Sequence, residues 1–556
     1  MINPIHLFAA VTGMVSVALA APHSVTYPVK PTSISAIENI PADYAEMISD
    51  DAIAIAWAPD IKSLFATANQ EIKWLGVVPF PTTMNDLFDG MMTSDLTIPT
   101  DTPVIAWAEF AKGPTGAGPM DVIPFVALKI PGANEKNINA ASGTKIFFDG
   151  DMVIAAQGDV SNWSKPAKPS TRLVSCLPNK PIAVAVDIAK VWKQQGSQLK
   201  MLSNFAVMGL QMSFADSMDT AKSEDRVSIR KTQQLISNFT GSIMNGLMAQ
   251  MASMDFMTMS LEVARDDFQI QMDFIFNDDL GLDDGVPSKL ITDLPGDMTL
   301  YGAMSASVAR SIFDLELELM DSMMTGLNKN QQSEMDAVAG QTKDLVNSLT
   351  GGVAVAVRLD KGLAINKWTE LGVKDADAFI SSYSTLAQKL SKINMGIEME
   401  STGKDKWSMD INGKTLSKSM SNYFMGNQIP NNFDLDIDLS MVSKGRDVVV
   451  AKALTPNASF TDGEGSQQDW LQPPVGRALI GGLVLNFQEL LLSVMNSMES
   501  PEEAKVIEAV KEMPHPLVIQ GSAKDKSFRI DISGFQLGII LPALGKARQV
   551  AEERVN

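Results

Sequence analysis

The side chains that most often carry catalysis or bind metals are scarce in this chain, which has three histidines and one cysteine among its 556 residues. A zinc-hydrolase signature H-E-x-x-H needs two histidines four residues apart, and His6, His23 and His515 cannot form it. The G-x-S-x-G turn that presents a nucleophilic serine is also absent from the sequence. His515 stands between Pro514 and Pro516 in a rigid turn, where we expect a structural role. We therefore predict no catalytic residue, no metal ligand and no cofactor, and a protein that is not an enzyme.

Methionine is the other residue type whose spacing could do chemistry, because the chain has 34 of them. One cluster holds six: Met244, Met248, Met251, Met254, Met257 and Met259. The first three recur at the spacing of one helical face, which favours packing in a core. A pliable apolar groove for a lipid-like ligand is the alternative, and a thioether copper site is a weaker one because so few histidines accompany it. Met244, Met248 and Met251 are therefore the candidate ligand-binding residues.

Acidic residues alternate with leucine and isoleucine from Asp434 to Leu439, which places Asp434, Asp436 and Asp438 on one side of a strand. This alternation is typical of a half-buried strand with a solvated acidic face. Weak binding of a cation at that face is the alternative interpretation.

The net charge separates some classes of partner from others, because 45 basic residues stand against 65 acidic ones and leave the chain at −20. Such a surface repels phosphate backbones and anionic lipid, so we predict no nucleic-acid binding. Solubility is the simplest consequence of the excess acid.

The N-terminus has the pattern of an export signal. Residues 1–20 contain no Asp, Glu, Lys or Arg, and their apolar stretch ends in Ala18-Leu19-Ala20. Small residues at these positions predict a cleaved signal peptide, with cleavage between Ala20 and Ala21. No later apolar run reaches the ~20 residues that a membrane-spanning helix needs, so we predict no transmembrane span in the mature chain. A single cysteine excludes internal disulfides, which in an exported chain of this size fits a bacterial protein better than a eukaryotic secreted one. We therefore predict a location in a bacterial periplasm or outside the cell.

A local order of strand, capping residue and helix recurs four times along the chain. The predicted caps are Asp60, Asp187, Ser305 or Ser307, and Asn486, each directly after a short apolar run. Hairpins recur as well, with two alternating segments around a short polar turn such as Lys404-Asp405-Lys406. The other predicted hairpins centre on residues 149–150, 265–267 and 524–526.

These recurring units suggest an internal duplication and an α+β fold with two similar lobes. Each lobe is predicted to be an antiparallel sheet packed against long Met-rich helices, among them residues 198–218, 227–254, 309–327 and 331–349. The predicted divisions are a signal peptide at 1–20, a linker at 21–41, lobes at 42–290 and 291–540, and a short C-terminal helix at 541–556.

The last segment, from Leu537 to Arg548, looks like the L-L-P-A-L-x-K-A-R stretch of some bacterial pilin-like precursors. In those precursors it follows an N-terminal processing motif, whereas here it lies near the C-terminus, so the likeness does not imply pilus assembly. The layout of strand–helix–hairpin units resembles that of large exported bacterial proteins of unknown function. This resemblance implies an envelope location and a two-lobed α+β fold, and it transfers no functional residue.

Two functions of different classes follow as hypotheses. The first is a non-catalytic envelope or extracellular protein that acts as a scaffold or interaction partner for another protein. The second is a carrier that encloses an apolar, lipid-like small molecule between Met-rich helices and sheet, and a hydrolase ranks last. An exposed apolar patch would favour the scaffold, and an apolar cavity would favour the carrier.

Overall fold

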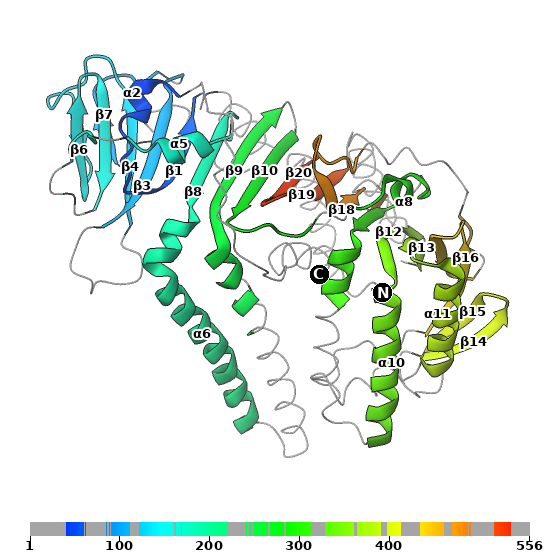
Figure 1. Cartoon of the computed structure of the whole chain (residues 1–556). Coiled ribbons are helices and arrows are strands. Elements are labelled where there is room, and N and C mark those ends of the chain that lie inside the picture. Colours follow the sequence, from blue (N-terminus) through cyan, green and yellow to red (C-terminus); the bar gives the residue numbers. More distant parts are fainter. Residues whose placement is uncertain are drawn as a thin grey trace, which may run out of the picture.

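The structure is a computed structural model of the whole chain (Figure 1). It describes the following residues: 40–59, 62, 85, 88, 91–99, 101–111, 122–158, 160, 163–167, 169–178, 180–220, 241, 244–246, 248–264, 267–282, 285–296, 298–313, 329–360, 364–390, 397–412, 434–456, 458–460, 470–486, 489–490 and 516–534. The signal peptide, the cleavage site at Ala20 and Ala21, almost all of the linker, His23, His515 and the C-terminal helix at 541–556 lie outside these residues.

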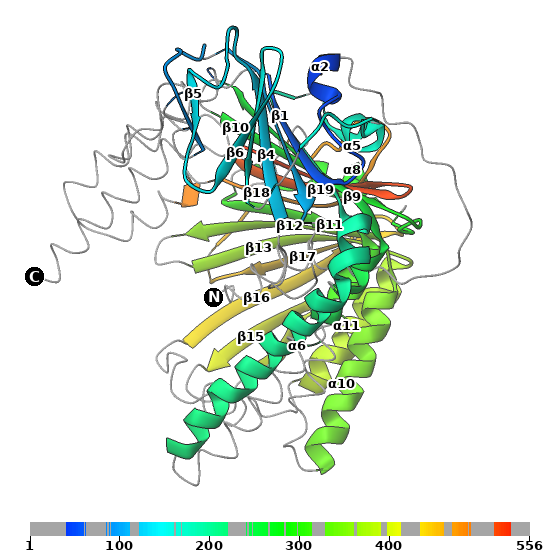
Figure 2. The ribbon, with the colours of Figure 1, turned by 90° about the vertical axis from the view of Figure 1, so that its left-hand side faces the viewer.

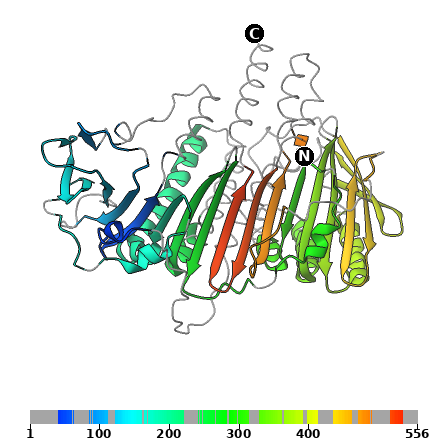
Figure 3. The same ribbon diagram turned by 90° about the horizontal axis from the view of Figure 1, so that it is seen from above.

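One sheet of 18 strands runs through the described part of the molecule, and every neighbouring pair in it is antiparallel (Figure 3). Its strands, in spatial order, are β6 (Thr144–Asp149), β7 (Met152–Gln157), β4 (Val122–Lys129), β3 (Val104–Phe110), β1 (Ala52–Ala58), β8 (Ile182–Asp187), β9 (Met254–Ala264), β10 (Asp267–Phe276), β20 (Ser527–Ser533), β19 (Leu517–Lys524), β18 (Ala478–Leu485), β11 (Leu300–Met304), β12 (Leu349–Asp360), β13 (Ala364–Val373), β17 (Val448–Leu454), β16 (Asp434–Ser443), β15 (Lys406–Asn412) and β14 (Ile397–Gly403). A small second sheet pairs β2 (Met92–Ser94) with β5 (Ile138–Ala140).

The predicted fold of two α+β lobes is wrong, because the strands of both parts belong to one continuous sheet. Among the described residues 45% are strand and 27% are helix. The joint is the antiparallel pair β10–β20, in register from Ile270 opposite Ile532 to Ile275 opposite Ser527. On this pair the Arg529 guanidinium donates two hydrogen bonds to the Asp273 carboxylate, at 2.7 and 3.1 Å. Main-chain hydrogen bonds and this bidentate ion pair therefore join the two sheets that the sequence pattern predicted to be separate.

The order of strands is the same on both sides of the β10–β20 joint. Outward from β10 the sheet continues through β9, β8, β1, β3, β4, β7 and β6, and outward from β20 through β19, β18, β11, β12, β13, β17 and β16. Strands β15 and β14 extend the second side further. The duplication and the lobe boundaries stay predictions, but this shared order shows that the two sides have the same path.

The structure contains the predicted hairpin turns and three of the predicted helix caps, and the fourth predicted cap, Asp60, lies outside the described residues. The caps after β8, β11 and β18 accept backbone N–H groups: Asp187 from Lys190 at 2.8 Å, Ser305 from Val308 at 3.4 Å and Asn486 from Glu489 at 3.2 Å. All four predicted hairpins are present as β6–β7, β9–β10, β14–β15 and β19–β20. The turn aspartates Asp405 and Asp525 adopt positive φ, which aspartate tolerates better than most residues.

The helices whose bounds the structure describes are α2 (Ala42–Ala45), α5 (Thr171–Cys176), α6 (Ile188–Thr220), α8 (Ser288–Thr292), α10 (Lys329–Asn347) and α11 (Ala376–Leu390). Further helical residues are described at 244–246 and 248–253, before β9, and at 306–313, after β11. Helix α11 packs on β14, β16 and β17, and α10 packs beside it. Helix α6 begins at the sheet and then runs away from it, as Figures 1 and 2 show. The prediction that the long helices lie along the sheets therefore fails for α6. None of the described helices combines the length and apolarity needed to cross a membrane.

Candidate functional site

Helix α6 is anchored firmly at its start. It follows β8 directly, and the Asp187 side chain caps its first turn. Ile188 is buried in an apolar cluster with Met254 and Phe276. The Lys190 ammonium donates hydrogen bonds to the carbonyl oxygens of Asp50 and Ala52, the latter at 3.2 Å. These contacts fix the direction in which the rest of the helix leaves the sheet.

Beyond this anchor, α6 presents a row of large apolar side chains to solvent. Met201 is 52% exposed, Phe205 53%, Met208 49% and Met212 69%. Their spacing of four, three and four residues places them on one face of the helix. Only three other large apolar residues of the described part are comparably exposed, and these are scattered over strands and loops: Met259, Val442 and Val475. We name Met201, Phe205, Met208 and Met212 the α6 row.

The α6 row lies in a stretch without charge. From Met201 to Ala215 the sequence contains no Asp, Glu, Lys or Arg. The other exposed positions described on this face are Asn204 and Gly209. A Cβ placed on Gly209 meets no atom within 4 Å, so the glycine leaves open space in the middle of the row. Methionine side chains adapt to irregular surfaces, so this face can accept an apolar partner.

The candidate ligand residues Met244, Met248 and Met251 lie on a different helical segment, just before β9. All three are half-buried, and their spacing places them on one face of that segment. The remaining methionines of the cluster, Met254, Met257 and Met259, belong to β9 itself, so the predicted helix to residue 254 is too long. The helical spacing is thus correct for the first three, and whether they bind a ligand stays a prediction.

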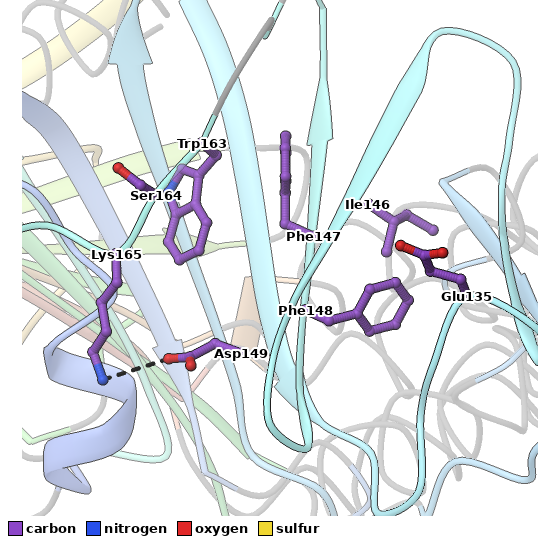
Figure 4. Close-up of a pocket in the computed structure, with 8 residues that line it drawn as sticks. All are labelled: Glu135, Ile146, Phe147, Phe148, Asp149, Trp163, Ser164 and Lys165. Atoms are coloured by element: carbon purple, nitrogen blue, oxygen red, sulfur yellow. Dashed lines mark ion pairs between the residues drawn. The ribbon is translucent and has the colours of Figure 1, made fainter.

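A cavity of about 370 Å³ lies beside β6, at one end of the sheet (Figure 4). On one side the rings of Phe147 and Trp163 lie 5.9 Å apart between centroids. There the Lys165 ammonium is 2.8 Å from a Glu46 carboxylate oxygen and 3.5 Å from one of Asp149. The hydrogen bond from Lys165 to Glu46 raises the pKa of the lysine, with further attraction from the charges of Glu46 and Asp149. The charged groups are exposed and paired with one another, which is the ordinary state of surface residues.

The acidic strand occurs as predicted, as β16. Asp436 and Asp438 are exposed, and Asp436 stands opposite Asp410 of the neighbouring strand. Desolvation raises the pKa of Asp410, and so does the negative charge of Asp436. Among the described residues, no group of three or more His, Cys, Asp or Glu side chains has the arrangement of a metal site.

One fully buried carboxylate, Glu370, lies in β13. The Trp368 indole N–H donates to its Oε1 at 3.2 Å, and the Lys444 ammonium is 3.9 Å from the same oxygen. Burial raises the pKa of Glu370, and the Lys444 charge opposes this shift. Its contacts are internal to the chain, so we assign it to the core.

The comparisons with known proteins add nothing to this geometry: no family, no curated protein and no solved structure matches the chain. The α6 row is accordingly the strongest candidate for a functional surface. Sequence reasoning missed it, although the uncharged stretch and the spacing from Met201 to Met212 were both readable.

Proposed function

We propose that this chain is a non-catalytic interaction protein, and that the α6 row is the surface through which it binds a protein partner. The exposed row carries this proposal. Its four large side chains are each about half exposed or more, and together they form an apolar face on one anchored helix. Contiguous exposed apolar faces often mark the sites at which proteins bind other molecules. An exposed apolar patch of this kind supports the scaffold hypothesis more than the hypothesis of a carrier with an enclosed apolar cavity.

Photo-crosslinking from single positions tests the proposal directly. A photoreactive amino acid replaces Met208 in the protein produced in its own host, and the matched control replaces Ala337, an exposed residue of α10. We expect a covalent protein adduct of defined mass from position 208 and none from position 337. Identical patterns from both positions would show that the α6 row has no specific partner.

The proposed place of action is a bacterial periplasm or the exterior of the cell. The apolar segment that ends in Ala18-Leu19-Ala20 supports export, and the single cysteine supports a bacterial rather than a eukaryotic exported protein. N-terminal sequencing of the protein from its host should find a chain that begins at Ala21. A mature chain that begins at Met1 would contradict export by a cleaved signal.

A further inference from the structure

We infer that a second copy of this chain pairs with β6 at the end of the sheet, with the two β6 strands antiparallel about a two-fold axis at Phe147. The contact surface is not the α6 row, so this dimer goes beyond the proposed function. Strand β6 is the last strand on its side of the sheet and pairs only with β7 among the described strands. We name the outer side of β6, over residues 145–149, the β6 edge.

The main-chain groups of Ile146 and Phe148 point away from β7. The Gly158 N–H donates to the Gly143 carbonyl oxygen at 3.2 Å, and β6 and β7 stay in unbroken register over Thr144–Asp149. Because hydrogen-bonded pairs alternate along an antiparallel ladder, the odd-numbered residues of β6 bond to β7 and the even-numbered ones face outward. No described residue bonds to the N–H and C=O groups of Ile146 and Phe148. These groups are therefore available for a further ladder.

Space for a further strand lies along the β6 edge, because the cavity of about 370 Å³ is lined by residues on both faces of β6. Phe147 and Trp163 lie on one face, and Phe148 lies on the other (Figure 4). A single cavity that touches both faces of a strand must lie beside an edge of that strand. The inner edge is occupied by β7, so the cavity lies at the outer one.

The second side of the sheet shows what covers this position in the same fold. Counted outward from the β10–β20 joint, β6 and β16 occupy the same place, and each forms a hairpin with the strand inside it, β7 or β17. Beyond β16 the ladder continues with β15, antiparallel and in register from Asp434 opposite Asn412 to Ser440 opposite Lys406. The occupant expected at the β6 edge is therefore an antiparallel strand.

The two end strands of the sheet differ in how they resist pairing with another chain. Strand β14, at the other end, exposes Glu398 and Glu400, and its register shifts near its turn. Like charges and irregular register are common means by which end strands avoid one another. Strand β6 has no irregularity and no proline, and its exposed charges, Lys145 and Asp149, have opposite signs. Its edge therefore lacks the features that prevent pairing with a second copy.

The sequence of β6 is complementary to itself in one antiparallel register. With Phe147 opposite Phe147 of the second copy, Ile146 pairs with Phe148 through the outward main-chain groups. Lys145 then lies opposite Asp149 at both ends of the contact and on the same face, because directly opposed residues share a face of the sheet. The two neighbouring registers that keep the hydrogen bonds place Phe147 opposite Lys145 or Asp149. Only the register about Phe147 pairs apolar residues with apolar ones and acid with base.

Both charged side chains can reach such a partner. Lys145 is exposed and makes no ion pair among the described residues. Asp149 is exposed, and its Oδ2 lies 3.5 Å from the Lys165 ammonium, which is closer to Glu46 at 2.8 Å. A carboxylate accepts several hydrogen bonds, so Asp149 can also bind Lys145 of the second copy.

Sedimentation velocity on the full chain from its host tests the dimer, in ~0.15 M salt to screen the repulsion between chains of charge −20. We expect concentration-dependent dimers of wild type. Lys145→Asp and Asp149→Lys should each dimerise at least tenfold more weakly, because each creates two like-charged contacts. The matched control Lys404→Asp, at an exposed lysine between β14 and β15, should dimerise like wild type. A wild type that stays monomeric to several hundred micromolar overturns the inference.

An equimolar mixture of Lys145→Asp and Asp149→Lys tests the register. In the mixed dimer the new aspartate of one chain lies opposite the new lysine of the other, and the original Asp149 lies opposite the original Lys145. We expect the mixture to associate within about threefold of the wild-type affinity. Single variants that dimerise normally would overturn the inference, and so would a mixture no stronger than its components when both variants unfold in urea at the wild-type midpoint.

Hydrogen exchange of the wild type locates the contact without any substitution, so it also decides the case of a variant that fails to fold. The amides of Ile146 and Phe148 should exchange at least tenfold more slowly where the dimer predominates than in dilute protein. The amides of β14, the other end strand, provide the control and should exchange at the same rate in both. A dimer that leaves Ile146 and Phe148 unchanged overturns the inference.

The α6 row has its own readout, which separates this inference from the proposed function. The protein adduct from position 208 should form equally in wild type and in Lys145→Asp. A monomeric wild type that still gives this adduct removes the β6 dimer and keeps the interaction protein. A dimer that Met208→Glu abolishes and Lys145→Asp does not would also overturn the β6 pairing, because the second copy would then bind the α6 row.

Discussion

Helices α6 and α11 start alike and end differently. Each is capped by an aspartate whose carboxylate accepts a backbone N–H three residues on, Asp187 from Lys190 at 2.8 Å and Asp375 from Ala378 at 3.0 Å. Each also carries large apolar side chains at helical spacing. In α11 these side chains are covered, because Phe379, Ile380, Leu386 and Ala387 are buried with residues of the neighbouring strands. In α6 the row beyond Lys200 is open to solvent.

The difference teaches that an apolar helical face contributes to folding only where the sheet reaches it. Burial of each large side chain in α11 stabilises the fold by about 1.5–3 kcal/mol. The α6 row contributes little of this kind, and Gly209 in its middle costs about 0.5–1 kcal/mol relative to alanine. Nothing around Gly209 requires a glycine for internal packing, since the space beside it is empty. A partner whose side chain fills this space would explain both the exposed row and the glycine at its centre.

The largest expected effect separates the phenylalanines of the two helices. Phe379→Ala in α11 should lower the free energy of unfolding by about 3–5 kcal/mol, because it leaves a cavity in a packed core. Phe205→Ala in α6 should change it by no more than about 0.5 kcal/mol, because the ring is half exposed. Urea unfolding of both variants, followed by tryptophan fluorescence, measures the difference.

Both variants and the wild type are compared at low protein concentration, because any association through the α6 row would add its own stabilisation to the wild type. If Phe205→Ala then lowers the free energy of unfolding as much as Phe379→Ala does, the α6 row is part of the folded core and the contrast between the two helices is wrong.

The sequence predicted those parts of the fold that depend on residues close together along the chain. A cap needs a side chain and an N–H three residues apart, and a tight hairpin needs a turn of a few residues. Asp187, Ser305 and Asn486 were therefore recognisable as caps, and residues 404–406 as a turn. Asp405 even adopts the positive φ that its residue type tolerates.

The single sheet was beyond such signals. The β10–β20 pair joins Asp273 to Arg529, which are 256 residues apart. Both residues alternate with apolar neighbours, which is also the pattern of charges on a solvated strand face. Neither strand alone shows which other strand it pairs with, so the β10–β20 pair could not be predicted from either segment. For the same reason the sequence predicted a helix at residues 198–218 but not whether the sheet would cover its apolar face.

The smallest expected effect is on the pH dependence of stability, and it comes from an ionisable side chain on the buried face of α11. Burial raises the pKa of Tyr383 in α11, whose ring lies edge-on to Trp407 at 5.6 Å. The folded protein thus favours the neutral phenol. This contribution is complete below the ordinary pKa of about 10 and is lost as the pH rises through the higher pKa of the folded state. The free energy of unfolding of wild type should therefore fall more steeply above pH ~10 than that of Tyr383→Phe.

Spectrophotometric titration of tyrosine identifies the group, because the curves of wild type and Tyr383→Phe should differ by one late-ionising phenol. Tyr44, whose pKa burial raises to about 12, is present in both proteins and cancels. The stretch from Met201 to Ala215 contains no charged residue and no tyrosine, so Met208→Ala should leave the alkaline profile of stability unchanged. If Met208→Ala alters the dependence of the free energy of unfolding on alkaline pH and Tyr383→Phe does not, the roles assigned to the two helices are reversed. The exposed face of α6 would then be the one that contributes to folding.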